Sequence, residues 1–127
     1  MQPDTKIWLK LAQEDYRNAQ LLWKNRRYGV TVFCYQQAVE KMLKAYIVER
    51  KKIAPSKTHK IEWLIKEAAL DIGEIESPDV TELSKAYIRV RYPDLNKQYY
   101  TRKERVEPLV ITAEKVYLWI KQKFTKQ

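Results

Sequence analysis

One stretch decides the fold, residues 29–52, with the sequence GVTVFCYQQAVEKMLKAYIVERKK. Its apolar side chains recur every three or four residues, which is the spacing of one face of an α-helix. This stripe consists of Tyr35, Ala38, Val39, Met42, Leu43, Tyr46 and Ile47. The stretch therefore predicts a long helix that begins at Gly29 or Val30, buries one face, and fades in the charged segment 49–52.

The segment before this helix predicts another of similar length. It follows Pro3 and Asp4, which suit a helix start, and it stops near residues 25–29. Because the connection is short, the two helices are expected to pack as an antiparallel hairpin. The apolar positions of the first helix are Ile7, Trp8, Leu11, Ala12, Ala19, Leu22 and Trp23.

Two shorter helices are predicted in the middle of the chain. Thr58 is placed to cap the first of them, and Gly73 to end it. The second is predicted to open at 77–79, because Ser, Pro and Asp there supply a cap, a first-turn proline and an acid. Pro93 ends this helix at Tyr92 or just before, since the residue before a proline avoids the helical conformation. Their stripes are Ile61, Leu64, Ile65, Ala68 and Ile72, then Leu83, Ala86, Tyr87 and Val90.

A last helix follows the capping-box spacing of residues 101–104 and carries Val106, Leu109, Val110, Ala113, Tyr117 and Ile120 on one face. Pro108 conflicts with that start, so either the helix bends there or its regular part begins near Glu107. Alternation with period two is absent over any useful length. The pattern predicts an all-α fold of five helices in one domain spanning residues 1–127.

Composition excludes several classes of function. The chain has 127 residues and a net charge of +9, with two isolated glycines, one cysteine and one histidine. A glycine-rich phosphate loop, a zinc cluster and an internal disulfide are therefore excluded, and we expect neither metal nor cofactor. The longest strictly apolar run, 116–120, is far too short to span a bilayer, and the start resembles no secretory signal. These features predict a cytoplasmic protein that does not enter membranes.

Positive charge gathers in two segments, 41–60 and 85–105. In the second, tyrosines interleave with the cations, and arginine forks with aromatic faces suit phosphate and unstacked bases. The other interpretation is that the cations cover solvated helix faces and the tyrosines pack inside. The candidate ligand-binding residues are Arg89, Arg91 and Lys97 for phosphate, Tyr92, Tyr99 and Tyr100 for base stacking, and Asp94 as a neutralising neighbour of Arg91.

A polar patch on the second helix is also a candidate. Gln37, Glu40, Lys41 and Lys44 share one side of that helix, next to Gln36, and Glu40 with Lys44 forms a favourable pair four residues apart. Either this is an ordinary polar face, or the adjacent glutamines are held within the bundle or a dimer contact, where their amides must find partners.

The chain resembles the HEPN family, small α-helical domains of bacteria and archaea named for proposed nucleotide binding. The resemblance rests on Trp8-Leu9 with Glu14-Asp15, on residues 36–45, on the 55–59 loop leading to Ile61 and Leu64, and on Arg91-Tyr92-Pro93-Asp94. It implies an up-and-down bundle of four long helices with a short accessory helix, usually dimeric. Some members pair with a small nucleotidyltransferase as toxin and antitoxin, and the likeness implies such a partner here.

Many members of this family cleave RNA with an arginine and a histidine that are separated by four to six residues. Here Asn96 stands where the nearest histidine after Arg91 would be, and the only histidine, His59, lies upstream. An amide does not exchange protons near neutral pH, so the resemblance supports binding and weakens catalysis. For His59 two roles stay open: orienting its loop or a neighbouring helix, and touching a ligand.

Three hypotheses follow. The leading one is a nucleotide- or RNA-binding homodimer that is not an enzyme and acts with a nucleotidyltransferase partner. The second is a metal-independent ribonuclease toxin in which Arg91 stabilises the transition state and Asn96 or a tyrosine positions the substrate. The third is a purely structural dimer that masks a partner.

Overall fold

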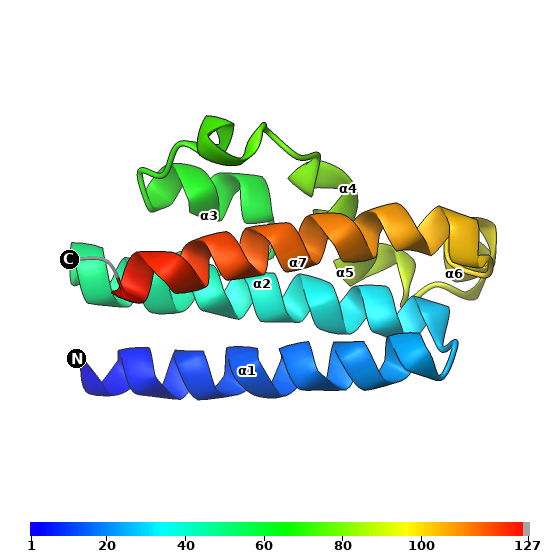
Figure 1. The fold of residues 1–127 in the computed structure, drawn as a ribbon, viewed down its shortest axis with the longest axis horizontal. Helices are drawn as coiled ribbons and strands as arrows, with labels where there is room; N and C mark the ends of the chain where they lie inside the picture. The colour runs from blue at the N-terminus through cyan, green and yellow to red at the C-terminus, as the bar shows by residue number, and fades with distance from the viewer. Residues whose placement is uncertain (126–127) are drawn as a thin grey trace.

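The computed structural model describes residues 1–125, and most of them are helical. Three long helices run side by side, α1 (Pro3–Lys24), α2 (Tyr28–Lys51) and α7 (Lys103–Thr125) (Figure 1). No strand occurs in residues 1–125, so the predicted all-α helical bundle is confirmed. Within this range every helix is too short or too polar to cross a membrane. Between α2 and α7 lie α3 (Ile61–Glu67), the 3-10 helix η1 (Ile72–Ile75), α4 (Val80–Ser84), α5 (Ala86–Arg89) and α6 (Pro93–Tyr99).

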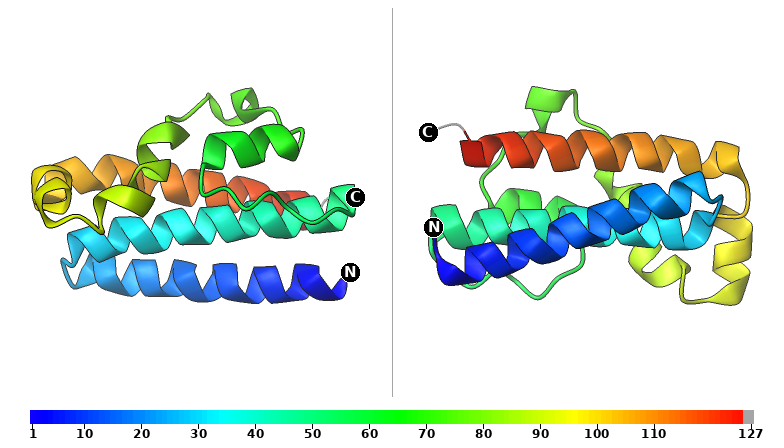
Figure 2. Two further views of the ribbon diagram at one scale, coloured as in Figure 1. Left: turned by 180° about the vertical axis from the view of Figure 1, so that it is seen from behind. Right: turned by 60° about the horizontal axis from the view of Figure 1, so that its bottom comes forward.

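α1 crosses α2 as the predicted antiparallel hairpin (Figure 2). Small side chains make the contact close, because Thr5, Ala12 and Ala19 recur every seven residues and each is fully buried. The predicted apolar stripe of this helix is only partly correct, since Ile7 is 58% exposed and Leu11 is 38% exposed. The buried face of α1 is therefore narrower than its apolar pattern, and it is centred on the small residues.

α2 is the central element and packs against α1, α3, α5 and α7. Its predicted stripe is buried, with Leu43 and Tyr35 fully inside and Tyr46 half-buried. The segment 52–60 then turns back and runs along α2 before α3 begins (Figure 2, left). This return brings His59 beside the middle of α2, which determines the geometry of the site described below.

The third predicted helix is shorter than expected. α3 ends at Glu67, and Ala69 adopts a left-handed backbone with φ of 56°, so the chain leaves the helix before Gly73. Gly73 lies within η1 instead, where its N–H donates to Asp71 at 2.9 Å. Thr58 does not cap α3: the hydroxyl of Ser84, from α4, accepts from the first helical N–H of Ile61 at 2.8 Å. A cap supplied by a distant helix is invisible to local sequence patterns.

The fourth predicted helix is split. It begins at Val80, with Asp79 rather than Ser77 as its cap, and Lys85 separates α4 from α5. Pro93 lies in the first turn of α6, a helix that was not predicted from the sequence. The bundle therefore has three long helices, and the short helices α4 and α5 fill the place of the fourth.

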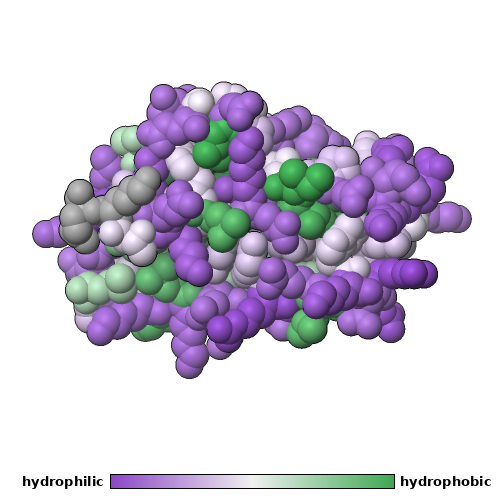
Figure 3. All heavy atoms as spheres, viewed as in Figure 1, coloured by the Kyte–Doolittle hydropathy of each residue, from purple (hydrophilic) through white to green (hydrophobic). Residues whose placement is uncertain are grey.

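α7 begins at Lys103, upstream of Glu107, and continues through Pro108. The hydroxyl of Thr101 donates to the carbonyl of Lys97 at 2.9 Å, so it closes the end of α6 instead of forming the predicted capping box. The face seen in Figure 3 is mostly hydrophilic, with small separate apolar patches over α7 and between α7 and α1. On that face no broad apolar surface is left open.

Candidate functional site

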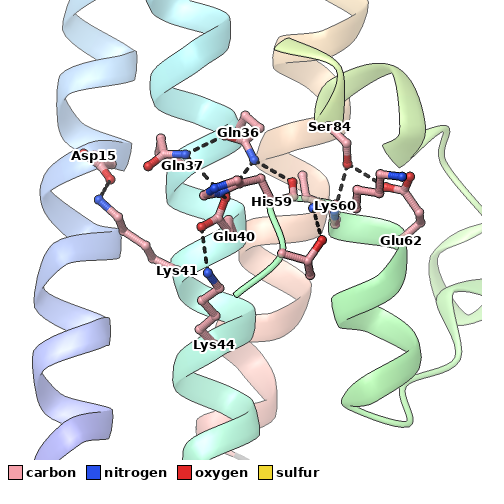
Figure 4. A network of polar contacts seen from close by, with 12 residues as sticks. Asp15, Gln36, Gln37, Glu40, Lys41, Lys44, His59, Lys60, Glu62 and Ser84 are labelled. Atoms are coloured by element: carbon pink, nitrogen blue, oxygen red, sulfur yellow. Dashed lines mark hydrogen bonds and ion pairs between the residues drawn. The ribbon is translucent and has the colours of Figure 1, made fainter. Parts of the chain in front are cut away.

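A polar network lies in the middle of α2 and is mostly buried (Figure 4). Glu40 is its centre and is 3% exposed. Its Oε1 accepts from Nε2 of Gln36 at 3.0 Å, and its Oε2 accepts from Nζ of Lys44 at 3.0 Å. Gln37 completes the group by donating from Nε2 to Oε1 of Gln36 at 2.7 Å. The predicted pair of Glu40 with Lys44 is confirmed, and the two amides are held within the bundle rather than spread over a solvated face.

Lys41 differs from its neighbours in this patch. Its ammonium forms an ion pair with Asp15 of α1 at 2.6 Å, with both side chains about four-fifths buried. Lys41 therefore ties α2 to α1, whereas Glu40 contacts His59 of the loop that precedes α3, and the ammonium of Lys44 lies 5.5 Å from the centre of the Trp8 ring of α1. The side chains predicted to share one polar face therefore contact two different segments, α1 and the loop before α3.

His59 joins the network through two groups. Its Nδ1 lies 3.0 Å from Oε1 of Glu40, and its backbone carbonyl accepts from Nε2 of Gln36 at 3.0 Å. A carboxylate oxygen only accepts, so Nδ1 carries the proton and Nε2 is the nitrogen left for another partner. The imidazole ring stacks on Tyr87 with centroids 3.6 Å apart and planes 12° apart. With its side chain 41% exposed, His59 is oriented by the fold and still open to solvent.

Arg91 contacts the same tyrosine, Tyr87. Its guanidinium carbon lies 4.1 Å from the centre of the Tyr87 ring and 5.9 Å from that of Phe33. Because the imidazole covers one face of Tyr87 at 3.6 Å, the guanidinium occupies the other face. Arg91 is exposed, and among residues 1–125 it forms no ion pair with Asp94 or any other carboxylate. The structural bridge between Arg91 and Asp94, weighed from the sequence, is not formed.

The candidate residues predicted around the fourth helix do not form one cluster, because Arg89 and Arg91 lie in different surroundings. Arg89 is directed into a separate pocket of about 280 Å³, where it pairs with Glu82 at 3.2 Å and stacks on Tyr99 at 3.7 Å. Hydrogen bonds from Lys85 and then from Arg89 lower the pKa of Glu82. Tyr100 is 2% exposed, and burial raises its pKa, so its ring is part of the core and is closed to a base. The cation of Arg89 is therefore already satisfied, in contrast to that of Arg91.

The residues of α6 have mixed roles. Asp94 and Lys97 are exposed in its first and last turns, where each charge complements the helix dipole. Tyr92 is 55% exposed and remains available for stacking. Asn96 instead packs on α2: a Cβ at Gly29 would lie 2.6 Å from its Oδ1, and its Nδ2 donates to the carbonyl of Val90 at 3.4 Å. Its amide fixes the position of α6 and does not point at a reacting group.

The combination of His59, Tyr87, Phe33 and Arg91 was not predicted from the sequence. Tyr87 counted both as a position of an apolar stripe and as one of the tyrosines interleaved with the cations of segment 85–105, and Phe33 only as a neighbour of the glutamines. The signal that could have joined them was present, because residues 36–45, the 55–59 loop and Arg91 all belong to the segments that carry the family resemblance. Chemically, the group offers one guanidinium that has no carboxylate partner within residues 1–125, which suits an anionic ligand, and one imidazole nitrogen that can accept a hydrogen bond.

Comparison with known proteins gives the family of this chain and agrees with its fold. Residues 5–123 match the HEPN domain family. The crystal structure of TT1696 from Thermus thermophilus is similar, with a TM-score of 0.74 and 26% sequence identity over 96% of this chain and 99% of that one. A search of curated proteins gives no match. Since the family match spans nearly the whole chain, the protein belongs to the HEPN family of nucleotide- and RNA-related domains.

Proposed function

We propose that this domain binds single-stranded RNA, with Arg91 contacting phosphate, His59 accepting a hydrogen bond from a ribose hydroxyl, and Tyr92 stacking on a base. The observation that carries the proposal is the state of Arg91, an exposed guanidinium that lies 4.1 Å from the centre of the Tyr87 ring and has no carboxylate partner in residues 1–125. The cation–π contact holds the guanidinium in place while its N–H groups stay available for phosphate oxygens. The net charge of +9 adds long-range attraction for a polyanion.

His59 supports the same ligand. Glu40 holds the proton on Nδ1, so Nε2 of this partly exposed ring is an acceptor, which suits the 2′-hydroxyl of a ribose. Lys60 and Lys85 are exposed beside this ring and extend the positive surface. A ribonuclease built on Asn96 gains no support from the geometry, because Asn96 is engaged with Gly29 and Val90.

The test is fluorescence anisotropy with a labelled single-stranded RNA. Arg91→Ala should weaken binding by about 1–3 kcal/mol, the scale of a charge-assisted hydrogen bond. It should also reduce the slope of log K against log salt by about 1. The melting temperature should change little, because the side chain is exposed. Arg17→Ala, which removes an exposed arginine from α1, is the matched control, and equal losses in both variants would refute the site.

We also propose a homodimer whose contact includes the ends of α2 and α5. Val30 is 46% exposed near the start of α2, and α5 packs against α2, so apolar surface is open beside these helix ends. Such a contact brings the two copies of Arg91 near each other, and an RNA phosphate between them relieves their repulsion. Family resemblance alone supports the nucleotidyltransferase partner, and co-purification of such an enzyme with the tagged protein would test it.

A further inference from the structure

A cavity of about 430 Å³ opens beside the proposed RNA-binding residues. His59 and Tyr87 form one wall, so the cavity adjoins the stack that carries Arg91. Ile88, 57% exposed, supplies an apolar flank, while Lys60 and Lys85 also line the cavity. A concave, largely apolar space next to a phosphate-binding cation has the layout of a nucleobase pocket.

One carboxylate in this cavity is oriented for recognition. Oε1 of Glu62 accepts from the hydroxyl of Ser84 at 2.7 Å, and that hydroxyl in turn accepts from the N–H of Ile61 at 2.8 Å (Figure 4). Ser84 is 7% exposed, so its hydroxyl is fixed. Within residues 1–125, Oε2 of Glu62 has no hydrogen bond, and neither Lys60 nor Lys85 pairs with Glu62. An acceptor is therefore left open in a region of positive charge.

The wall of the cavity is rigid before any ligand arrives. The carbonyl of His59 is held by Gln36, its ring by Glu40, and the N–H of Ile61 by Ser84. The Lys60 N–H also donates to the hydroxyl of Thr58 at 3.1 Å. Because these contacts order the segment in advance, a bound base does not lose affinity to the ordering of this loop.

We propose that this cavity receives one unstacked base that bears an exocyclic amino group, and that Glu62 selects it by accepting from that amino group. The inference rests on the proposed RNA-binding function and names the substrate class of the same site. A carboxylate accepts well from N4 of cytosine, whereas uracil presents an oxygen at that position and is repelled. A paired base has no free edge, so the ligand is single-stranded.

The experiment compares oligocytidine and oligouridine of about 12 nucleotides by anisotropy, a length that spans one such binding surface. The wild-type protein should bind oligocytidine about tenfold more tightly, the scale of one hydrogen bond to a charged group. Glu62→Gln should abolish or invert this preference, because the glutamine keeps the Ser84 contact through its oxygen and presents an N–H₂ donor to the base. Glu76→Gln, at a side chain that is 91% exposed, should leave the preference unchanged.

Competition by CMP and UMP against labelled oligocytidine is a second readout that needs no variant. CMP should compete better than UMP. If CMP competes with the same affinity as the oligonucleotide, the ligand is a free nucleotide. If CMP competes much more weakly, the ligand is an RNA strand. Both results agree with the proposed pocket. Binding that depends on Arg91 but shows no preference for cytosine overturns this inference and leaves the proposed function standing. Binding that ignores Arg91→Ala removes the proposed function itself.

Discussion

Glu40→Gln should be among the most damaging single substitutions in this protein. Glu40 and Lys44 form a buried ion pair with side chains 4% and 7% exposed. The glutamine keeps the shape but removes the charge, so the ammonium of Lys44 stays buried without its counter-ion. Removing one partner of such a pair costs roughly 3–5 kcal/mol. For a domain of this size, that corresponds to a fall in melting temperature of about 10–20 °C.

Thermal and urea denaturation, followed by circular dichroism, would measure this cost. The double variant Glu40→Gln with Lys44→Met should recover most of the stability, because it leaves no unpaired buried charge. Glu76→Gln is the matched control, since Glu76 and Lys115 are 4.0 Å apart and exposed, and its cost should be near zero. A loss below about 1 kcal/mol for Glu40→Gln, or no recovery in the double variant, would refute the reasoning.

Three further predictions concern stability and assembly. Burial raises the pKa of four tyrosines, and that of Tyr16 reaches about 12. The free energy of unfolding should therefore have its full value below pH 10, the ordinary pKa of tyrosine, and should fall at higher pH. A urea midpoint that stays constant between pH 10 and about 12 would contradict this. The other three are Tyr35, Tyr100 and Tyr117. In the wild type, Gly29→Ala should not stabilise the protein, because the new Cβ meets Asn96. In an Asn96→Ala background the same substitution should stabilise it by up to about 1 kcal/mol. Equal effects in both backgrounds would exclude that contact. Light scattering at micromolar concentration should give twice the chain mass of 15.3 kDa, and the monomer mass would exclude the dimer.

The long helices were predictable because their apolar spacing and end signals agree with each other. The middle of the chain was not. The boundary of α3 depends on Ser84, which lies in α4, and the start of α6 reuses Pro93, which local rules treat as a stop. Where helix ends are set by contacts between distant segments, a local pattern identifies the element but misplaces its limits.

The candidate site was only partly predictable, again because contacts between distant segments determine it. Sequence proximity grouped Arg89 with Arg91, yet Arg89 is the last residue of α5 and Arg91 lies in the turn beyond its end, so their side chains make different contacts. Arg89 contacts Glu82 and Tyr99, whereas Arg91 contacts Tyr87. Two interpretations of the glutamine-rich segment were open from the sequence, and the buried Gln36 agrees with the one in which the amides are held within the bundle. Its partner His59 was not predicted, because the return of segment 52–60 along α2 is a tertiary feature.

The most direct test of the central claim is an NMR titration of the labelled protein with single-stranded oligocytidine. If the RNA binds where we propose, the largest amide shifts should fall in residues 58–62 and 87–92, and Arg91→Ala should suppress them. Shifts that concentrate instead on α7, or that persist unchanged in Arg91→Ala, would contradict the proposed binding site.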